Sequence, residues 1–367
     1  MNVRIRLAKR VDDSYDILIQ HGLGKRLGVQ IVRDGFGAKY CIVTDTRIGR
    51  LFGGKLLRQV RYAGAKAELV SFPPGEKSKS LATLEKVLDK MISMGFDRKD
   101  CVIALGGGVA GDVAGFAAAT YMRGINFVQV PTSLLAMVDS SIGGKTGVNL
   151  VKAKNSAGSF TQPKRVYVCP EFLAGLPRSE VSNGMSEVVK IAAMLDAKFF
   201  AYLESHTEKI MSLDMKTMEK VIKRACELKA RIVEKDEREN NLRKIVNFGH
   251  TIGHAIETLG NYGKFSHGQA ISIGMVAESE VSKRLGGLSR KDVQKIENLL
   301  HNFGLPTRLP KYSASSIITQ TKKDKKASGG KVTYAVPKSI GKPYSRKGVI
   351  GLHASDALVK KSLGVLR

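Results

Sequence analysis

The chain has 367 residues, with 60 lysines and arginines against 33 aspartates and glutamates, so its formal net charge is +27. Apolar residues make up 43% of the sequence and are mixed with the charges along its length, which excludes a disordered chain. This length suits two domains of ordinary size. No run of 18 apolar residues occurs, so we expect no transmembrane helix. The excess of positive charge raises one hypothesis, a nucleic-acid binder.

The N-terminal residues and the cysteines indicate in which cellular compartment the protein is expected. Residues 1–7 alternate apolar with polar or basic side chains, which predicts a strand rather than a signal peptide. The four cysteines, Cys41, Cys101, Cys169 and Cys226, are far apart and form no CxxC pair. We therefore expect free thiols, a reducing compartment and a cytoplasmic protein.

Short apolar segments alternate with helical patterns in the first half of the chain. Strands are expected at 40–44, 68–72, 101–105, 127–130 and 165–168, and an amphipathic helix at 80–94. Strands that alternate with helices predict βαβ units and a parallel sheet. We therefore expect an α/β domain over residues 1–170.

The rhythm changes after about residue 170. Helices are expected at 181–194, 197–211, 215–235, 249–259, 268–286 and 290–303. Residues 322–347 are rich in lysine and contain glycine, which predicts a loop followed by a hairpin. We expect an all-α second domain over residues 171–367.

A glycine-rich turn follows the strand expected at 101–105. Residues 106–112 (GGGVAGD) fit the pattern G-x-G-x-x-G, which lets backbone N–H groups approach a pyrophosphate at a helix N-terminus. The acidic residue that usually follows about 20 positions later is absent, and Asp112 lies inside the turn instead. A nucleotide would therefore be held in a different way, and a tight turn without a ligand is the alternative.

A second glycine-rich segment resembles the end of a phosphate-binding P-loop. Gly144, Lys145 and Thr146 match that end, but Asp139 stands where a P-loop needs glycine. We therefore reject an NTPase. Lys145 remains a candidate phosphate contact, with an exposed loop lysine as the alternative.

Three histidines fall within eighteen residues, His250, His254 and His267. The first two share a helix face, which suits a metal site, although Thr251 replaces the glutamate of a metalloprotease motif. An open zinc site would need one acidic ligand more, and the candidates are Glu187 and Glu257. Structural histidines are the alternative.

Basic residues also occur inside apolar helical patterns. Each alone is typical of a solvated face, but together they fit a pocket for an anionic substrate. The residues within the helical patterns are Lys190, Lys229 and Arg243, and Arg123, Lys145 and Lys154 could line the same pocket.

Taken together, these motifs resemble those of the 3-dehydroquinate synthase family, and the resemblance covers nearly the whole chain. The segments that carry the resemblance include 105–116 (LGGGVAGDVAGF), 130–149 (VPTSLLAMVDSSIGGKTGVN), 186–190 (SEVVK), 236–239 (DERE), 247–257 (NFGHTIGHAIE) and 324–326 (DKK). The resemblance implies an α/β NAD-binding domain followed by a helical domain that binds metal and substrate. Family members are commonly homodimers.

The resemblance also implies a reaction in the shikimate pathway, towards chorismate and the aromatic amino acids. The enzyme would convert 3-deoxy-D-arabino-heptulosonate 7-phosphate into 3-dehydroquinate and phosphate, with NAD and a divalent metal, zinc first and cobalt second. The implied steps are transient oxidation by NAD, phosphate elimination, re-reduction, ring opening and intramolecular aldol closure. The partner is a small substrate carrying a carboxylate and a phosphate, and neither nucleic acid nor a membrane is expected.

Carried over position by position, the resemblance assigns the site residues. The metal ligands would be Glu187, His250 and His267. The NAD contacts would be Asp45, Glu76, Lys79, Gly107, Gly108, Asp112, Thr132 and Ser133. The substrate positions would be Asp139, Lys145, Lys154, Asn155, Lys190, Lys229, Arg243, Asn247 and one of Lys325 or Lys326, with Arg123 reaching the phosphate in the neighbouring subunit. His254 would shuttle a proton, and Lys145, Lys190 and Asn155 would assist catalysis.

Two rival enzyme classes share this plan. Other sugar-phosphate cyclases should lack part of the set Arg243, Lys229 and Asn247. NAD-dependent polyol or glycerol-phosphate dehydrogenases should lack the cluster formed by Lys145, Lys154, Asn155 and residues 324–326, and they should release NADH. Departures from the family pattern are small. Gln269 replaces the usual glutamate after His267 and Gly268, Gly175 stands where threonine is common, and Ser133 replaces threonine.

Overall fold

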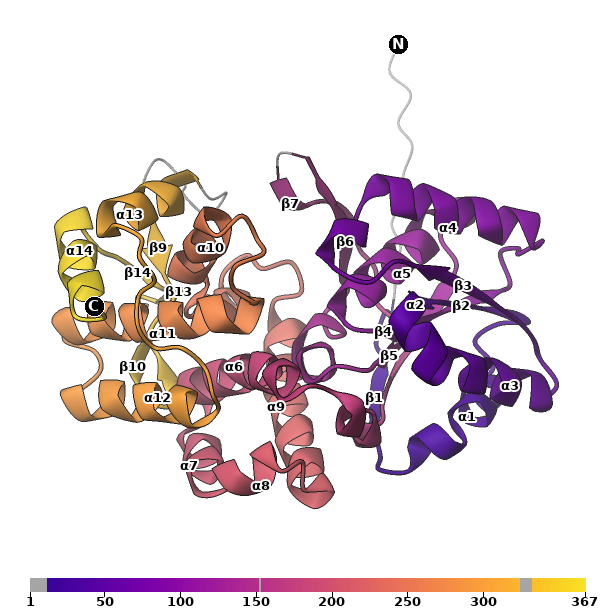
Figure 1. The fold of residues 1–367 in the computed structure, drawn as a ribbon, viewed down its shortest axis with the longest axis horizontal. Helices are drawn as coiled ribbons and strands as arrows, with labels where there is room; N and C mark the ends of the chain where they lie inside the picture. Colours follow the sequence, from indigo (N-terminus) through magenta and orange to yellow (C-terminus); the bar gives the residue numbers. More distant parts are fainter. Residues whose placement is uncertain (1–11, 152, 324–331) are drawn as a thin grey trace, which may run out of the picture.

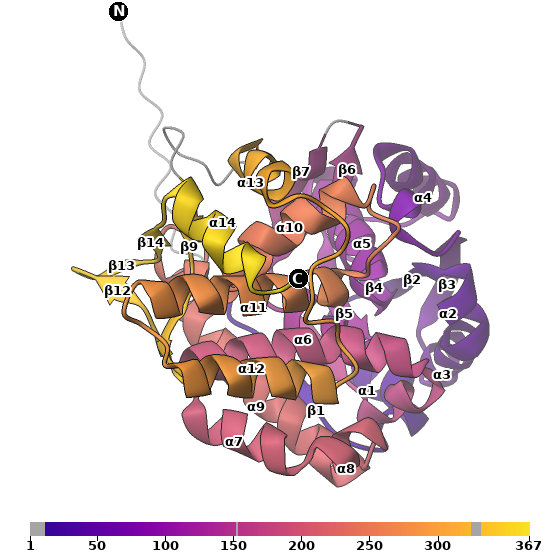
Figure 2. The same cartoon turned by 60° about the vertical axis from the view of Figure 1, so that its left-hand side comes forward.

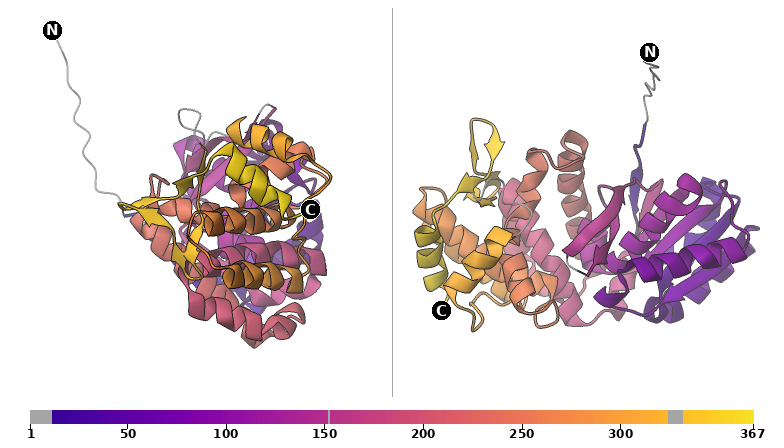
Figure 3. Two further views of the ribbon diagram at one scale, coloured as in Figure 1. Left: turned by 90° about the vertical axis from the view of Figure 1, so that its left-hand side faces the viewer. Right: turned by 90° about the horizontal axis from the view of Figure 1, so that it is seen from above.

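The structure, a computed structural model, describes residues 12–151, 153–323 and 332–367. It has two lobes side by side, a sheet lobe (residues 12–168) and a helical lobe (residues 178–367), as Figure 1 shows. Figure 3 shows the two lobes from above. The strand expected at residues 1–7 lies outside the described residues.

Six parallel strands form the sheet of the first lobe, in the order β1-β8-β5-β4-β2-β3. The strands are β1 (Asp16–Ile19), β2 (Lys39–Asp45), β3 (Lys66–Phe72), β4 (Cys101–Gly106), β5 (Asn126–Pro131) and β8 (Arg165–Val168). All five strands expected from the sequence are confirmed. β1 was not predicted, since it is a short edge strand that pairs only with β8.

Helices cover both faces of this sheet because alternate strand residues point to opposite sides. Ile42 packs in one core with α1 (Leu27–Asp34) and α3 (Gly54–Tyr62). Val43 packs in a second core with α4 (Leu81–Ser93) and α5 (Gly108–Thr120). The helix expected at 80–94 is α4. The first core runs on into the helical lobe without a break, so the two lobes share apolar contacts.

Two further strands leave the sheet as a separate ladder. β6 (Lys145–Leu150) pairs antiparallel with β7 (Ala153–Phe160). A P-loop lysine precedes a helix, whereas Lys145 opens a strand, which agrees with the rejection of an NTPase. The ladder carries three of the predicted substrate residues, Lys145, Lys154 and Asn155.

The second lobe is helical, as expected. Its helices are α6 (Arg178–Leu195), α7 (Ala197–Ser205), α8 (Thr207–Met211), α9 (Met215–Lys235), α10 (His250–Leu259), α11 (His267–Arg284), α12 (Arg290–Asn302), α13 (Ala314–Lys323) and α14 (Asp356–Gly364). Helices α6, α11 and α12 pack against one another (Figures 1 and 2). The pattern at 197–211 gives two helices, not one. Side chains of Ser205, His206 and Thr207 bond to carbonyls of the preceding turn and compete with helix continuation.

Short ladders complete the helical lobe, which is therefore not purely α. β10 (Pro337–Ser339) pairs with β11 (Lys342–Pro343), the hairpin expected within 322–347. β12 (Ser345–Arg346) pairs with β13 (Val349–Ile350), and β9 (Thr333–Tyr334) pairs with β14 (Leu352–His353). These paired segments are two or three residues long, so they give almost no periodic signal.

All four cysteines are free and buried, which confirms the expectation of free thiols. Burial raises the pKa of the Cys41 and Cys226 thiols to about 12. Among the described residues, no helix combines the length and apolar content needed to cross a membrane.

Candidate active site and metal centre

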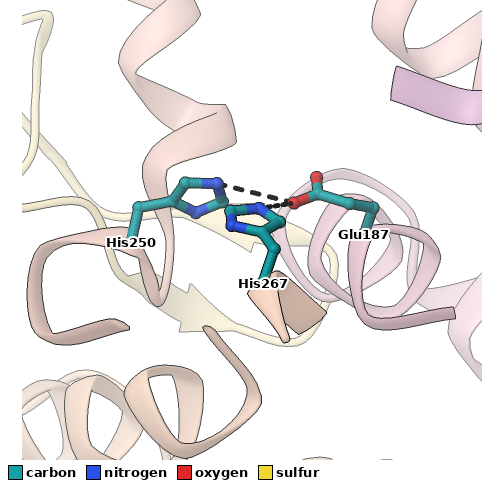
Figure 4. A group of neighbouring side chains, drawn as sticks. All are labelled: Glu187, His250 and His267. Carbon is teal, nitrogen blue, oxygen red and sulfur yellow. Dashed lines mark hydrogen bonds and ion pairs between the residues drawn. The ribbon is translucent and has the colours of Figure 1, made fainter. Parts of the chain in front are cut away.

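Three side chains of the helical lobe converge on one point. Glu187 lies in the middle of α6, while His250 and His267 are the first residues of α10 and α11. The Nε2 atoms of His250 and His267 lie 3.5 Å and 3.2 Å from Oε1 of Glu187, as drawn in Figure 4. A carboxylate and two imidazoles from three helices match the three protein ligands of an open zinc site. The donor set therefore fits a divalent metal.

Hydrogen bonds behind the rings fix which nitrogen faces this point. Nδ1 of His250 lies 3.2 Å from the carbonyl of Phe248, to which it donates when protonated, so Nε2 is the nitrogen turned to Glu187. Nδ1 of His267 lies 3.5 Å from Oε2 of Glu257. Burial opposes a charge on His267, but its bonds to Glu187 and Glu257 outweigh burial and raise its pKa to about 9. A metal would replace that proton.

A second possible ligand group shares His267. Ligand atoms of His254, Glu257 and His267 also lie within 4.8 Å of one another. His254 stands one turn after His250, and their ring centroids are 5.3 Å apart. The structure thus brings both acidic candidates, Glu187 and Glu257, beside His267, and it is Glu187 that faces Nε2 of both His250 and His267.

Two buried lysines surround the carboxylates. Lys190 pairs with Glu187 one turn away on α6. Lys229 on α9 pairs with Asp139, which belongs to the sheet lobe, so this ion pair links the lobes. Burial lowers the pKa of Lys229, and Asp139 only partly offsets this. For Asp139, burial is outweighed by the charges of Lys229 and Lys190, which lower its pKa. Both amines are therefore held in place inside the protein.

Further predicted substrate residues surround Glu239, a residue to which the sequence reasoning gave no role. The Glu239 carboxylate pairs with Lys145 from the β6–β7 ladder and accepts a hydrogen bond of 2.6 Å from Nδ2 of Asn247. The only hint in the sequence was its place in the segment 236–239. Arg243 is buried and donates to the carbonyls of Gly143 (3.1 Å) and Glu237.

The predicted nucleotide residues gather at the carboxyl ends of β2, β4 and β5. Gly106 has φ +153°, and Gly107 is the N-cap of α5 without any capping side chain. Asp45 caps α2 (Thr46–Ile48), with Oδ1 accepting from the backbone N–H groups of Arg47 and Ile48 at 2.9 Å. The N–H of Thr132 donates to the carbonyl of Gly106 at 2.9 Å. Ligands of open α/β sheets bind at this edge.

Charged residues join this edge to the β6–β7 ladder. Lys79 pairs with Asp112 and donates to Asn155. Burial raises the pKa of Asp112 more than Lys79 lowers it. Glu76 accepts from Asn149 at 2.8 Å and lies 4.0 Å from Nζ of Lys154, which also lies 3.6 Å from Oε1 of Glu257. Lys154 thus lies between the predicted nucleotide edge and the candidate metal centre.

The remaining predicted site residues lie at the margin of these groups or outside the described residues. The hydroxyl of Ser133 stands 3.4 Å from the point where a Cβ on Gly107 would lie, so it lines the glycine turn. Arg123 is exposed just beyond the far end of α5, roughly 20 Å from the glycine turn. Lys325 and Lys326 lie outside the described residues.

Solved structures with this fold define the class of protein. ValA, the 2-epi-5-epi-valiolone synthase of Streptomyces hygroscopicus subsp. jinggangensis, solved with NAD+ and Zn2+, matches with a TM-score of 0.89 and 27% identity over 99% of both chains. A 2-deoxy-scyllo-inosose synthase complexed with carbaglucose-6-phosphate, NAD+ and Co2+ matches with a TM-score of 0.85 and 27% identity over 96% of both. A butanol dehydrogenase of Thermotoga maritima, at 14% identity and TM-score 0.68, covering 98% of both chains, shares the fold alone. The fold is that of dehydroquinate synthase-like cyclases.

Sequence comparison identifies the family. Models described as the N-terminal and C-terminal parts of 3-dehydroquinate synthase match residues 69–183 and 184–327. The 3-dehydroquinate synthase of Thermodesulfovibrio yellowstonii is 44% identical over 93% of this chain and 94% of its own. That of Pelobacter propionicus is 42% identical over 96% and 98%. The chain belongs to the 3-dehydroquinate synthase family.

Proposed function

We propose that this enzyme converts 3-deoxy-D-arabino-heptulosonate 7-phosphate into 3-dehydroquinate and phosphate, using NAD and a divalent metal. The observation that carries the proposal is the convergence of His250 and His267 on Glu187, beside the buried amines of Lys190 and Lys229. Such a centre combines metal ligands with fixed positive charge, which suits a substrate that bears a carboxylate and a phosphate. Relatives at 44% and 42% identity carry the name of this activity.

Glu187, His250 and His267 would hold the metal, with zinc the expected ion and cobalt the alternative. A divalent metal bound there acts as a Lewis acid towards substrate hydroxyls. His254, one turn from His250, lies close enough to His250 and His267 to take or return a proton at the hydroxyl that is oxidised. The second set of donor atoms (His254, Glu257 and His267) would then serve proton transfer and ligand orientation.

The edge formed by β2, β4 and β5 would hold NAD, which supplies a hydride acceptor when bound. Gly107 and Gly108, the N-cap and first residue of α5, carry no side chains, so backbone N–H groups at this helix end can face a pyrophosphate. Thr132 and Ser133 lie beside this turn, and Asp45 caps the neighbouring helix α2. Glu76, Lys79 and Asp112 would complete the contacts.

The positive side chains would orient the substrate. Lys229 and Lys190 are buried beside the metal ligands, and Asp139 keeps the Lys229 ammonium in place. Arg243 and Asn247 would take the substrate carboxylate, and Lys145, Lys154 and Asn155 on the β6–β7 ladder would take the phosphate end. Because Glu239 joins Lys145 to Asn247, it would hold the two sides of the pocket at a fixed spacing.

A homodimer would complete the site. Arg123 is exposed at the end of α5 that is remote from the glycine turn, and a second copy of the chain would bring this arginine to a neighbouring phosphate. The boundary between the two domains would fall near residue 170, because the sheet ends with β8 at Val168.

A phosphate-release assay tests the proposed activity. We expect phosphate from the heptulosonate 7-phosphate when NAD and Zn2+ or Co2+ are present, and none after chelation. Glucose 6-phosphate, which carbaglucose-6-phosphate resembles, serves as the control substrate for a different cyclase. Faster phosphate release from that sugar would contradict the proposed substrate.

A further inference from the structure

Helix α10, which begins with the metal-site residue His250, lacks a capping side chain of its own. Its N-cap is Gly249, with φ +80° and no side-chain hydrogen bond. A Cβ at this position would lie 2.5 Å from Cγ of Met275 and 2.6 Å from the carbonyl oxygen of Ile271, so α11 leaves no room for serine or aspartate. The first-turn N–H groups of α10 must find acceptors elsewhere.

Glu278 on α11 supplies these acceptors from outside the helix. Its side chain is fully buried. Oε2 accepts from the N–H of Gly249 at 2.7 Å, and Oε1 accepts from the N–H of Ile252 at 3.1 Å. One carboxylate therefore binds the backbone on both sides of His250. This fixes the position and direction of the first turn from which the imidazole projects.

The charge of Glu278 matters as well as its hydrogen bonds. His250 and His267 are both first residues of helices, and the N-terminal end of a helix carries partial positive charge. A divalent cation bound by these residues is repelled by both helix ends. A buried carboxylate on the first turn of α10 offsets that repulsion on the α10 side.

We propose that Glu278 is a positioning residue of the metal site, which orients His250 and lowers the electrostatic cost of holding a divalent cation there. The inference rests on the assignment of Glu187, His250 and His267 as metal ligands. Glu278 acts through the α10 backbone and is not itself a ligand. No sequence motif marks it, because its partners are main-chain atoms 26 and 29 residues earlier.

Co2+ binding alone, without NAD or substrate, tests this role. Glu278→Gln keeps the shape but loses the charge and one acceptor, so we expect Co2+ affinity to fall about 10- to 100-fold, with a changed visible absorption spectrum of the bound ion. The matched control is Glu280→Gln, a buried glutamate on the same helix whose Oε1 pairs with Lys283 at 2.6 Å. It should bind Co2+ as the unmodified chain does.

Several outcomes are distinguishable. If Glu278→Gln lowers only the thermal midpoint of the metal-free protein, with Co2+ affinity and spectrum unchanged, the role is structural and the proposal is wrong. If His250→Ala binds Co2+ normally, the ligand assignment itself fails. Where Glu278→Gln does not fold, Glu278→Asp keeps the charge but shortens the reach, and a loss of roughly 3- to 10-fold is expected. An unchanged affinity in that variant would overturn the proposal.

Discussion

Glycines are prominent both in the β4–α5 turn and where α10 crosses α11, but the two regions use them differently. At the crossing, a Cβ on Gly253 would lie 2.9 Å from Cα of Ile271 and 3.1 Å from the carbonyl of Ala270, so the backbones themselves forbid a side chain. In the turn, a Cβ on Gly108 would lie 3.2 Å from a movable hydroxyl, that of Ser140. Gly253 is therefore needed for packing, whereas Gly108 leaves space at the helix N-terminus.

The residues at the α10–α11 crossing are already arranged as a site, whereas those around the β4–α5 turn must rearrange to bind a ligand. The crossing places His250 and His267 at adjoining helix starts, so these two proposed metal ligands are in position within a single chain. At the nucleotide edge and the β6–β7 ladder, the polar side chains pair with each other instead, as Lys79 does with Asp112 and Lys145 with Glu239. A ligand there must exchange these pairs for its own contacts.

Removing a metal ligand should have the largest effect and tests the preassembled centre. His267→Ala should lose bound metal and more than about 100-fold in activity, because even residues behind the ligands contribute 10- to 100-fold. Metal content and phosphate release measure this. His301→Ala, an exposed histidine on α12, is the control and should keep both. Full metal content in the His267 variant would show that the ligand set is wrong.

Gly253→Ala should destabilise the fold. The added methyl meets backbone atoms of α11, and overpacking of this kind costs about 1–3 kcal/mol. Denaturant unfolding of the metal-free protein measures the free energy. Gly364→Ala in α14, where a Cβ meets nothing within 4 Å, should be neutral or slightly stabilising. Equal stability of the two variants would contradict tight packing at the crossing.

Gly108→Ala should do the reverse, with little change in stability and a weaker NAD interaction. Ser140 can shift to admit the methyl group, but the methyl occupies the space through which the phosphates approach. We expect the KM for NAD to rise about tenfold, equivalent to ~1.4 kcal/mol. A large loss of stability with an unchanged KM would mean that this glycine serves packing after all.

The smallest effect is expected for Gln269, the residue predicted to depart from the family pattern. Its Oε1 accepts from the N–H of Ser266 at 2.9 Å in a capping box at the start of α11. Glutamate keeps this acceptor and adds negative charge at a helix N-terminus. Gln269→Glu should therefore stabilise the folded protein by about 0.3–1 kcal/mol. Thermal unfolding measures this, and destabilisation would contradict the capping role.

Much of the fold followed from hydrophobic periodicity, and α9 has the predicted bounds, 215–235. Short elements such as β1 and β12 contain too few residues to show a period. The histidine spacing predicted a metal site, but the spacing alone left Glu187 and Glu257 equivalent, because only the three-dimensional arrangement turns Nε2 of His267 towards Glu187. Glu239 and Glu278 escaped prediction because their partners are distant in sequence or belong to the backbone.

The proposed reaction requires that NAD be regenerated in each turnover. It is tested most directly by following phosphate and the absorbance of NADH together, with the heptulosonate 7-phosphate in large excess over NAD. We predict many phosphates released per NAD, with no lasting rise in NADH. One NADH accumulated for each substrate consumed would identify a dehydrogenase and contradict the account.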